Sequence, residues 1–271
     1  MSDVRLEDWF ARDDAALAAD PDWPRMHMQL LAALERGEVR AARRGDDGTW
    51  RAEAWVKRAI LVGFRNTKIG PIDAVPAPFF DKSAYPVRAF ALDDGVRLVP
   101  GGSAVRRGAY LAPGVVVMPP AYVNVGAYVG PGTMVDSHAL VGSCAQIGAN
   151  VHLSAGAQIG GVLEPANAAP VVIEDGAFVG GLCGVFEGVV VRERAVLAAG
   201  VVLTAATVVH DLVHGCERRG EIPAGAVVVP GSRPASGAYA RERGLTVAAP
   251  LIVKYRDAKT DAGTALESAL R

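Results

Sequence analysis

The 271-residue chain has few cysteines, almost no net charge and no long apolar run. Its three cysteines, Cys144, Cys183 and Cys216, form neither a disulfide framework nor a CxxC zinc motif. A formal net charge of -1 argues against a dedicated nucleic-acid binder. No run of about 18 apolar residues predicts a membrane span. The acidic, amphipathic N-terminus is unlike a signal peptide, so we expect a cytoplasmic protein with reduced, buried thiols at Cys144 and Cys183.

Several nucleotide and hydrolase motifs are also missing. The sequence has no Walker motif, no Rossmann glycine fingerprint and no G-x-S-x-G elbow. Function therefore has to be sought in what the chain does contain.

A six-residue spacing of aliphatic residues dominates the chain. The residue four positions after each aliphatic anchor is usually small or β-branched. Repeats of this kind are typical of a parallel β-helix, in which three hexapeptides make one coil of about 18 residues. The anchors form two runs: Leu111, Val117, Val123, Val129, Val135, Val141, Ile147, Leu153 and Ile159, then Ile173, Val179, Val185, Val191, Leu197, Leu203 and Val209.

The repeat divides the chain into three predicted parts. Residues 1–100 form a small, mostly helical domain, with one amphipathic helix from Leu6 to Leu17, a second from Met26 to Leu34 and a third in AEAWVKRAILVGFR. Residues 101–230 form the β-helix domain. Residues 231–271 form an extension with a short strand and then a short helix. The two outer parts are plausible caps for the open ends of the coil.

Two segments interrupt the period, at 160–172 and 210–225. From Ile159 to Ile173 the chain runs 14 residues where two hexapeptides would take 12. Either two residues bulge from a coil, or eight residues leave it as a loop without using a coil side. Loops that leave a regular scaffold often carry binding residues, but a tolerated insertion is an equally good interpretation.

Asp136 is the strongest candidate for chemistry. It follows anchor Val135, at a position that is elsewhere held by glycine, and its carboxylate is expected to point outward near a corner. There it can act as a general base or bind a ligand. The alternative is an aspartate that stabilises its own turn.

Histidines and basic residues give weaker signals. His138 and His152 occupy different phases of the repeat, and His210 and His214 lie at the second interruption, so no metal is expected. The arginines Arg218 and Arg219 and the tail residues Lys254, Arg256 and Lys259 either contact phosphates or form a solvated surface.

The central block PAYVNVGAYVGPGTMVDSHALVGSCAQIGANVHLSAGAQIGGVLEP resembles the tetrahydrodipicolinate N-succinyltransferase family. The resemblance continues upstream in WVKRAILVGFR, FFDK and VRLVP. Downstream it continues in VVIEDGAFVG, EIPAGAVVVPGS and LIVKYRDAKT. The resemblance extends over residues from about 50 to 262, and the matching segments occur in the same order as in the family.

The resemblance implies a left-handed parallel β-helix with an N-terminal helical domain, assembled as a homotrimer with active sites between subunits. It implies succinyl transfer from the co-substrate succinyl-CoA to tetrahydrodipicolinate, giving N-succinyl-2-amino-6-oxopimelate in lysine and diaminopimelate biosynthesis. Asp136 matches the acidic residue for substrate binding and catalysis, and Arg97 in VRLVP matches a substrate-binding arginine. Lys254 and Lys259 match motifs that contact coenzyme A.

One departure concerns the second catalytic acid. The position where family members carry it is Gly184 here, and the nearest acid is Glu187, a candidate catalytic partner of Asp136. Three alternatives stay open: the same fold with acetyl-CoA or another amine acceptor, a non-catalytic β-helix binding protein, and a zinc-dependent hydratase.

Overall fold

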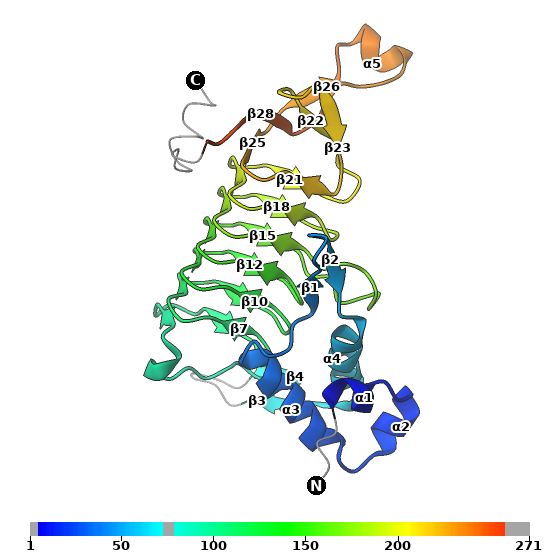
Figure 1. Ribbon diagram of the computed structural model, residues 1–271, viewed down its shortest axis with the longest axis vertical. Coiled ribbons are helices and arrows are strands. Elements are labelled where there is room, and N and C mark those ends of the chain that lie inside the picture. Colours follow the sequence, from blue (N-terminus) through cyan, green and yellow to red (C-terminus); the bar gives the residue numbers. More distant parts are fainter. Residues whose placement is uncertain (1–4, 73–78, 258–271) are drawn as a thin grey trace.

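The computed structural model describes residues 5–72 and 79–257. Its centre is a three-sided parallel β-helix, with the helical N-terminal region at one end and the C-terminal extension at the other (Figure 1). Successive two-residue strands take the three faces in turn, and each face is a sheet of strands one coil apart. Among the described residues the structure has no helix that is long and apolar enough to cross a membrane.

The three faces are named here by number. Face 1 contains β5 (Arg97–Leu98), β8 (Val116–Val117), β11 (Met134–Val135), β14 (His152–Leu153), β17 (Phe178–Val179), β20 (Val196–Leu197) and β25 (Ala226–Val229). Face 2 contains β6 (Ala104–Val105), β9 (Tyr122–Val123), β12 (Leu140–Val141), β15 (Gln158–Ile159), β18 (Gly184–Val185) and β21 (Val202–Leu203). Face 3 contains β7 (Tyr110–Leu111), β10 (Tyr128–Val129), β13 (Gln146–Ile147), β16 (Val172–Ile173), β19 (Val190–Val191) and β24 (Glu221–Ile222).

The predicted anchors form the interior of the coil. Val135, Ile147 and Leu153 are fully buried, and all sixteen predicted anchors belong to one continuous core cluster. Strands pair in register, so that Val135 lies between Val117 and Leu153. Burying each aliphatic side chain stabilises the fold by about 1.5–3 kcal/mol.

The corners explain a second periodicity. The third residue after an anchor usually has a positive φ, which is why glycine is common there, as at Gly132 and Gly156. His138, Cys144 and Asn150 take the same left-handed conformation without being glycine.

The first interruption is an extruded loop. β15 and β16 take consecutive places on faces 2 and 3, so no coil side is skipped and eight residues beyond the regular six leave the coil. This confirms the second of the two alternatives for residues 160–172. Helix α4 (Ala54–Asn66) holds the loop, because the buried Lys57 donates a hydrogen bond of 2.5 Å to the carbonyl of Ala168.

The second interruption begins earlier than predicted. Val209 is buried, but its strand β22 (Val209–Asp211) pairs with β23 (Cys216–Arg218) and does not take the next place on face 3. Ile222 of β24 takes that place beside Val191. The expectation that Val209 continues the coil is therefore wrong, because an aliphatic residue at the right spacing is equally able to fill the end of the core from a hairpin.

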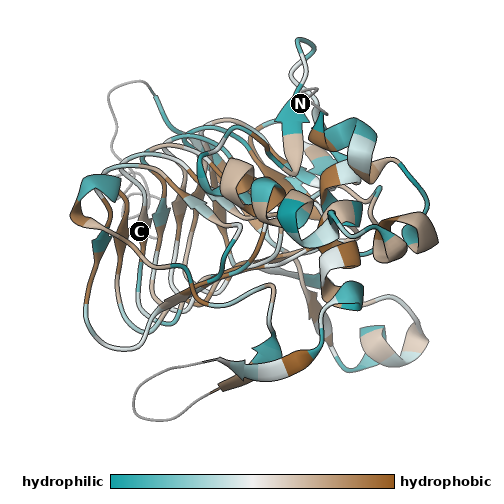
Figure 2. Cartoon of the chain, turned by 90° about the horizontal axis from the view of Figure 1, so that it is seen from below, coloured by the Kyte–Doolittle hydropathy of each residue, from teal (hydrophilic) through white to brown (hydrophobic). Residues whose placement is uncertain are grey.

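The N-terminal region packs around a core of its own beside faces 2 and 3 (Figure 2). Where one helix was expected from Leu6 to Leu17 there are two, α1 (Leu6–Phe10) and α2 (Asp14–Ala19), because the side chain of Asp13 caps the second by accepting from the Ala16 N–H. The other two predicted helices are confirmed as α3 (Trp23–Glu35) and α4. The remaining elements are β1 (Ala42–Arg44), β2 (Trp50–Ala52), β3 (Ile69–Ile72), β4 (Phe79–Lys82) and the 3-10 helix η1 (Leu92–Asp94).

The C-terminal extension closes the far end of the coil. β28 (Leu251–Tyr255), the predicted short strand, pairs antiparallel with β25 and parallel with β22, so it lengthens face 1. The helix predicted after it lies outside the described residues. Between β25 and β28 lie β26 (Ser232–Pro234), α5 (Ala238–Glu242) and β27 (Thr246–Ala248).

Two leucines with opposite exposure test the role of the interior. Leu153 is fully buried and Leu92 is 96% exposed. We expect Leu153→Ala to lower the free energy of unfolding by about 2–5 kcal/mol, because it opens a cavity in a stack that cannot collapse. Leu92→Ala, the same chemical change, should cost no more than about 0.5 kcal/mol. Urea unfolding of both variants measures this, and equal costs would contradict it.

Candidate functional site

Two of the predicted site residues lie along the outside of face 1. Arg97, on the first strand of that face, is exposed, and its guanidinium has no side-chain partner within the described part of the chain. Asp136 follows β11, two strands further along the face, at the corner between faces 1 and 2. At the usual strand spacing the two positions are separated by roughly 10 Å along the sheet. A small ligand can therefore reach from Arg97 to Asp136.

Asp136 combines the two predicted roles, because its carboxylate stabilises its own turn and also keeps one oxygen free for a ligand or a proton. Its Oδ1 accepts a 2.7 Å hydrogen bond from the N–H of Ser137, so the carboxylate does stabilise its own turn. Its Oδ2 has no donor among the described residues, and the side chain is half-buried. One oxygen is thus fixed by the backbone and the other is available to a ligand or a proton.

Glu187 lies at a different corner. It follows β18, between faces 2 and 3 and two coils beyond Asp136, with a φ of 54°. Its Oε2 accepts from the Ala205 N–H at 3.2 Å. Within one subunit the two carboxylates therefore do not face the same space.

A pocket of about 630 Å³ lies beside Glu187, between this corner and the extruded loop. Gly160, Glu164 and Phe186 contribute to its walls. The first interruption thus builds a cleft on the regular coil, as insertions in repeat scaffolds often do.

Gly184 is buried on face 2, beside the ring of Phe186, which lines this pocket. A Cβ at this position would approach the ring of Phe186 to 2.5 Å. The ring occupies the space into which a side chain at residue 184 would extend. Gly184 and Phe186 therefore act as a pair, and together they leave no carboxylate on this part of face 2.

Lys254 belongs to β28, at the far end of face 1. Seven strand-to-strand steps separate it from Arg97, roughly 34 Å. Only a ligand that extends along the sheet can reach both Lys254 and the neighbourhood of Asp136. Lys259 lies outside the described residues.

β28 is held in place by Asp211, a residue that sequence reasoning missed. Its side chain is completely buried and accepts from the hydroxyl of Tyr255 at 2.5 Å and from Nε of Arg218 at 2.8 Å. Nδ1 of His214 and two backbone N–H groups complete the set. The sequence feature that could have indicated Asp211 is its place in the segment HDLVHGCERR, where histidine and arginine side chains can donate hydrogen bonds to a carboxylate. Arg218 is engaged here, and Arg219 lies near Glu217.

The histidines and cysteines are placed apart. His152 lies beside Phe178 on the outside of face 1, with the two rings tilted by 44°, whereas His138 lies at a corner. Across the described ranges, no three His, Cys, Asp or Glu side chains are grouped to hold a metal ion. Burial raises the pKa of Cys183 to about 11 and that of Cys144 to about 12, so both are packing thiols, as predicted.

Comparison with known proteins decides the family. The family description "Tetrahydrodipicolinate N-succinyltransferase N-terminal" matches residues 5–65, and "Hexapeptide repeat of succinyl-transferase" matches residues 170–205. A 2,3,4,5-tetrahydropyridine-2,6-dicarboxylate N-succinyltransferase of Bradyrhizobium diazoefficiens is 44% identical over 90% of this chain and 88% of its own length. A protein of the same name from Azoarcus is 47% identical with the same coverage. The chain belongs to the tetrahydrodipicolinate N-succinyltransferase family.

A solved structure supports the fold. The crystal structure of a putative 2,3,4,5-tetrahydropyridine-2-carboxylate N-succinyltransferase from Campylobacter jejuni aligns with a TM-score of 0.52 and 18% sequence identity. The alignment covers 83% of this chain and 62% of the Campylobacter chain, so this member of the family spans less than two thirds of that structure.

The Asp211 cluster gives a pH-dependent prediction. Its hydrogen-bond donors lower the pKa of Asp211 well below its ordinary value of 3.8 against the opposing effect of burial. The stabilisation is therefore complete above about pH 4 and is lost as pH falls further, towards the folded-state pKa. At pH 7 we expect Asp211→Asn to lower the free energy of unfolding by about 1.5–3 kcal/mol.

The measurement is the difference in unfolding free energy between the native chain and Asp211→Asn across pH. That difference should shrink below pH 4. A constant difference from pH 7 to pH 3 would show that the charge of Asp211 does not stabilise β28.

Proposed function

We propose that this protein transfers the succinyl group of succinyl-CoA to the amine of tetrahydrodipicolinate, giving N-succinyl-2-amino-6-oxopimelate in lysine and diaminopimelate biosynthesis. The observation that carries the proposal is the 44–47% identity to relatives of that name over 90% of the chain. The arrangement of Arg97 and Asp136 on face 1 supports it. A guanidinium binds a substrate carboxylate well, and a carboxylate receives the proton of an attacking amine.

The reaction needs no covalent intermediate on the enzyme. The neutral amine attacks the thioester carbonyl, a C–N bond forms, and the C–S bond breaks to release coenzyme A as its thiolate. The amine loses one proton, and we assign the free Oδ2 of Asp136 as its acceptor. Backbone N–H groups at the corners are suitable donors to the oxyanion of the tetrahedral intermediate.

A homotrimer with active sites between subunits accounts for the separated carboxylates. Several outward side chains are apolar on face 1 (Val116, Met134, Phe178) and on face 2 (Leu140, Val202); Val202 is exposed and the other four are half-buried. Packing subunits through these two faces removes this apolar surface from water. In such an assembly Asp136 of one subunit can meet the Glu187 corner of a neighbour.

Coenzyme A is the proposed co-substrate, with its phosphates near Lys254 and Lys259. Its long pantetheine arm suits the separation between the Lys254 end of face 1 and Asp136. No metal is invoked. A cytoplasmic location agrees with the buried thiols Cys144 and Cys183.

Asp136→Asn tests the catalytic role. We expect kcat to fall by a factor of about 10²–10⁴, because the amide cannot accept the amine proton, while Oδ1 still accepts the Ser137 N–H and preserves the turn. The exposed Asp93 provides the control, since Asp93→Asn should retain full turnover. Turnover is measured as release of free coenzyme A, with unfolding curves to verify folding. Near-normal turnover in Asp136→Asn would remove Asp136 from catalysis.

The acyl donor is tested separately. With tetrahydrodipicolinate as acceptor, we expect kcat/KM for succinyl-CoA to exceed that for acetyl-CoA, since the distal carboxylate of the succinyl group can pair with a cation that an acetyl group cannot engage. A preference for acetyl-CoA would support the alternative donor. Failure to bind or turn over either thioester would favour a non-catalytic β-helix.

A further inference from the structure

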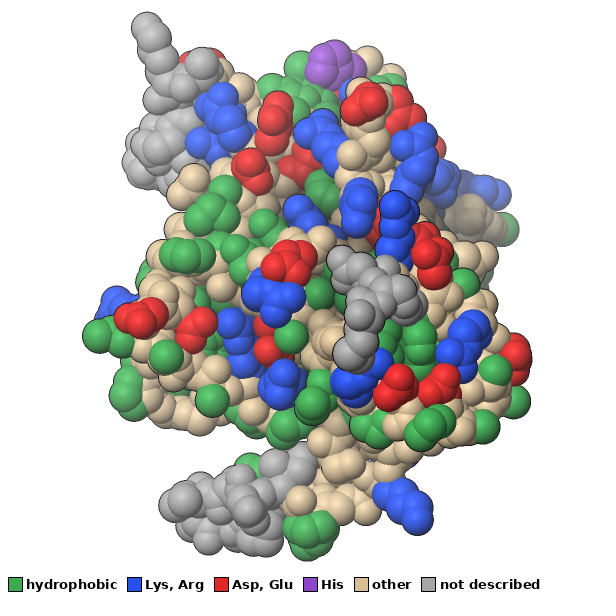
Figure 3. Space-filling model, turned by 60° about the horizontal axis from the view of Figure 1, so that its bottom comes forward, with side chains coloured by type: hydrophobic (Ala, Val, Ile, Leu, Met, Phe, Trp, Pro, Cys, Tyr) green, Lys and Arg blue, Asp and Glu red, His purple; other side chains and the backbone are tan. Residues whose placement is uncertain are grey.

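A second pocket, of about 400 Å³, lies on face 3 beneath the β1–β2 hairpin. It shares no lining residue with the pocket beside Glu187, and it contains none of Arg97, Asp136 or Lys254. Its volume falls within the range of small-molecule sites. On the face drawn in Figure 3, Lys and Arg side chains are interspersed with Asp and Glu side chains.

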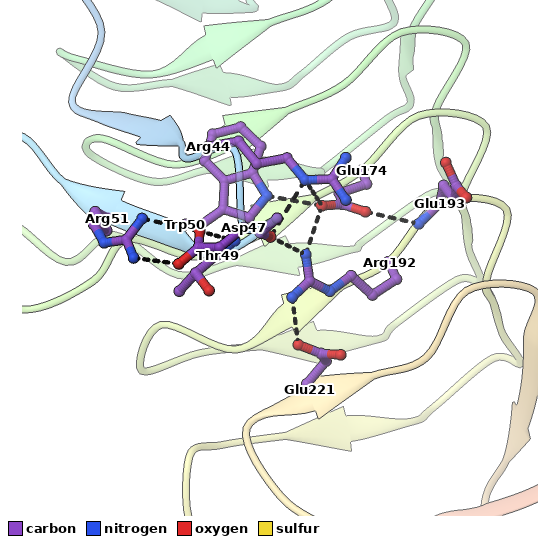
Figure 4. Close-up of polar contacts among 10 residues, drawn as sticks. Arg44, Asp47, Thr49, Trp50, Arg51, Glu174, Arg192, Glu193 and Glu221 are labelled. Carbon is purple, nitrogen blue, oxygen red and sulfur yellow. Dashed lines mark hydrogen bonds and ion pairs between the residues drawn. The ribbon is translucent and has the colours of Figure 1, made fainter.

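The hairpin that roofs the pocket is firmly tied to the coil. Glu174, only 6% exposed, accepts from Nε1 of Trp50 at 2.8 Å and from Arg192 at 3.0 Å, and Arg44 approaches to 3.6 Å (Figure 4). Its second oxygen accepts from the backbone N–H of Glu193. Both carboxylate oxygens of Glu174 therefore hold the walls, which preforms the space between them.

Arg40 supplies the pocket with a cation that lacks a counter-ion. Its guanidinium lies 3.6 Å from the centre of the Tyr128 ring, and its Nε donates to Gln146 at 2.9 Å. No carboxylate of the described chain lies within ion-pair distance, and burial lowers the pKa of Arg40. A charge that is partly removed from water is stabilised further when a counter-ion binds to it. The remaining N–H groups of the guanidinium fork are suited to a carboxylate.

The lining also contains anions that are free of cations. Asp175 accepts only the N–H of Ala149 through its side chain, and Glu193 is exposed with no ion pair among the described residues. The charge of Asp175 is felt by Arg40, although the two do not form an ion pair. Besides Arg44 and Glu174, which pair with each other, the pocket thus presents a cation and two carboxylates, with Trp50 and Tyr128 as aromatic walls.

We propose that this pocket binds a free amino acid, whose carboxylate pairs with Arg40 and whose ammonium group lies near Asp175 and Glu193. A simple anion would be attracted by Arg40 but repelled by the two carboxylates. A simple amine would be attracted by the carboxylates but repelled by Arg40. A zwitterion satisfies both. The aliphatic part of such a ligand packs against the aromatic walls.

The test is binding to the full-length protein, measured by calorimetry and by tryptophan fluorescence. The probes are L-lysine and L-norleucine as amino acids, hexanoate as the anion alone and pentylamine as the cation alone. We expect saturable binding of at least one amino acid, with affinity about tenfold or more above that of hexanoate or pentylamine. Trp50→Phe should abolish the fluorescence change, which locates the ligand beneath the hairpin.

Substitutions test which charged side chains bind the carboxylate and the ammonium group of the ligand. Arg40→Gln should weaken amino-acid binding about tenfold or more, and Glu193→Gln with Asp175→Asn should do the same without disturbing the core. Arg43→Gln is the matched control, because Arg43 is exposed on the same hairpin and pairs with Glu53 away from the pocket. If Arg40→Gln does not fold, the double carboxylate variant alone decides the question.

Two results would overturn the proposal. One is the absence of saturable binding of either amino acid at millimolar concentration. The other is binding that the carboxylate variant leaves unchanged. Neither result bears on succinyl transfer, which is measured with different substrates and variants.

Discussion

The stacking of aliphatic side chains along the axis of the coil is the constraint on which the rest of the structure depends. Each anchor contacts the anchors one coil above and below, as Val135 does between Val117 and Leu153. Once this register is set, every outward residue has a fixed height and a fixed face. Asp136 is at a corner because it follows an anchor, and Gly184 is on a face because it precedes one. The number of residues between a functional side chain and its anchor therefore determines where that side chain lies on the coil.

The repeat could be predicted from the sequence because its signal is local and long. Sixteen anchors at one spacing identified the interior, and every one of them is buried. The same logic failed at Val209, where spacing and hydrophobicity were right but pairing was not, since the strand belongs to a hairpin that folds over the end of the coil. The handedness of the winding follows from the family resemblance alone, because a hydrophobic period is the same for either hand.

The candidate site was harder to predict than the scaffold. The sequence indicated Asp136 and Arg97, and the structure places both on the side of face 1, but it separates Glu187 from them by a corner and two coils. The number of residues between Asp136 and Glu187 does not reveal this separation, because successive strands of the coil lie on three different faces. Asp211 and Glu174 were also missed, since the donors that surround each of them come from distant segments such as Tyr255 and Trp50. Buried carboxylates with many donors become visible only when those segments meet.

The two interruptions show how a regular coil acquires specificity. A strand of two residues offers one inward and one outward side chain, which leaves little room for a cleft. The loop at 160–172 adds a wall beside the corner of Glu187, and the hairpin at 209–218 adds the strand β22, against which β28 with Lys254 pairs. On face 3 the β1–β2 hairpin does the same from the N-terminal region, held by Glu174. In each case the added segment is fastened by a buried charged group, Lys57, Asp211 or Glu174, whose burial is favourable only when its partners are in place. The cost of leaving such a group unpaired is what keeps each wall in one position, and a fixed wall is what a binding site requires.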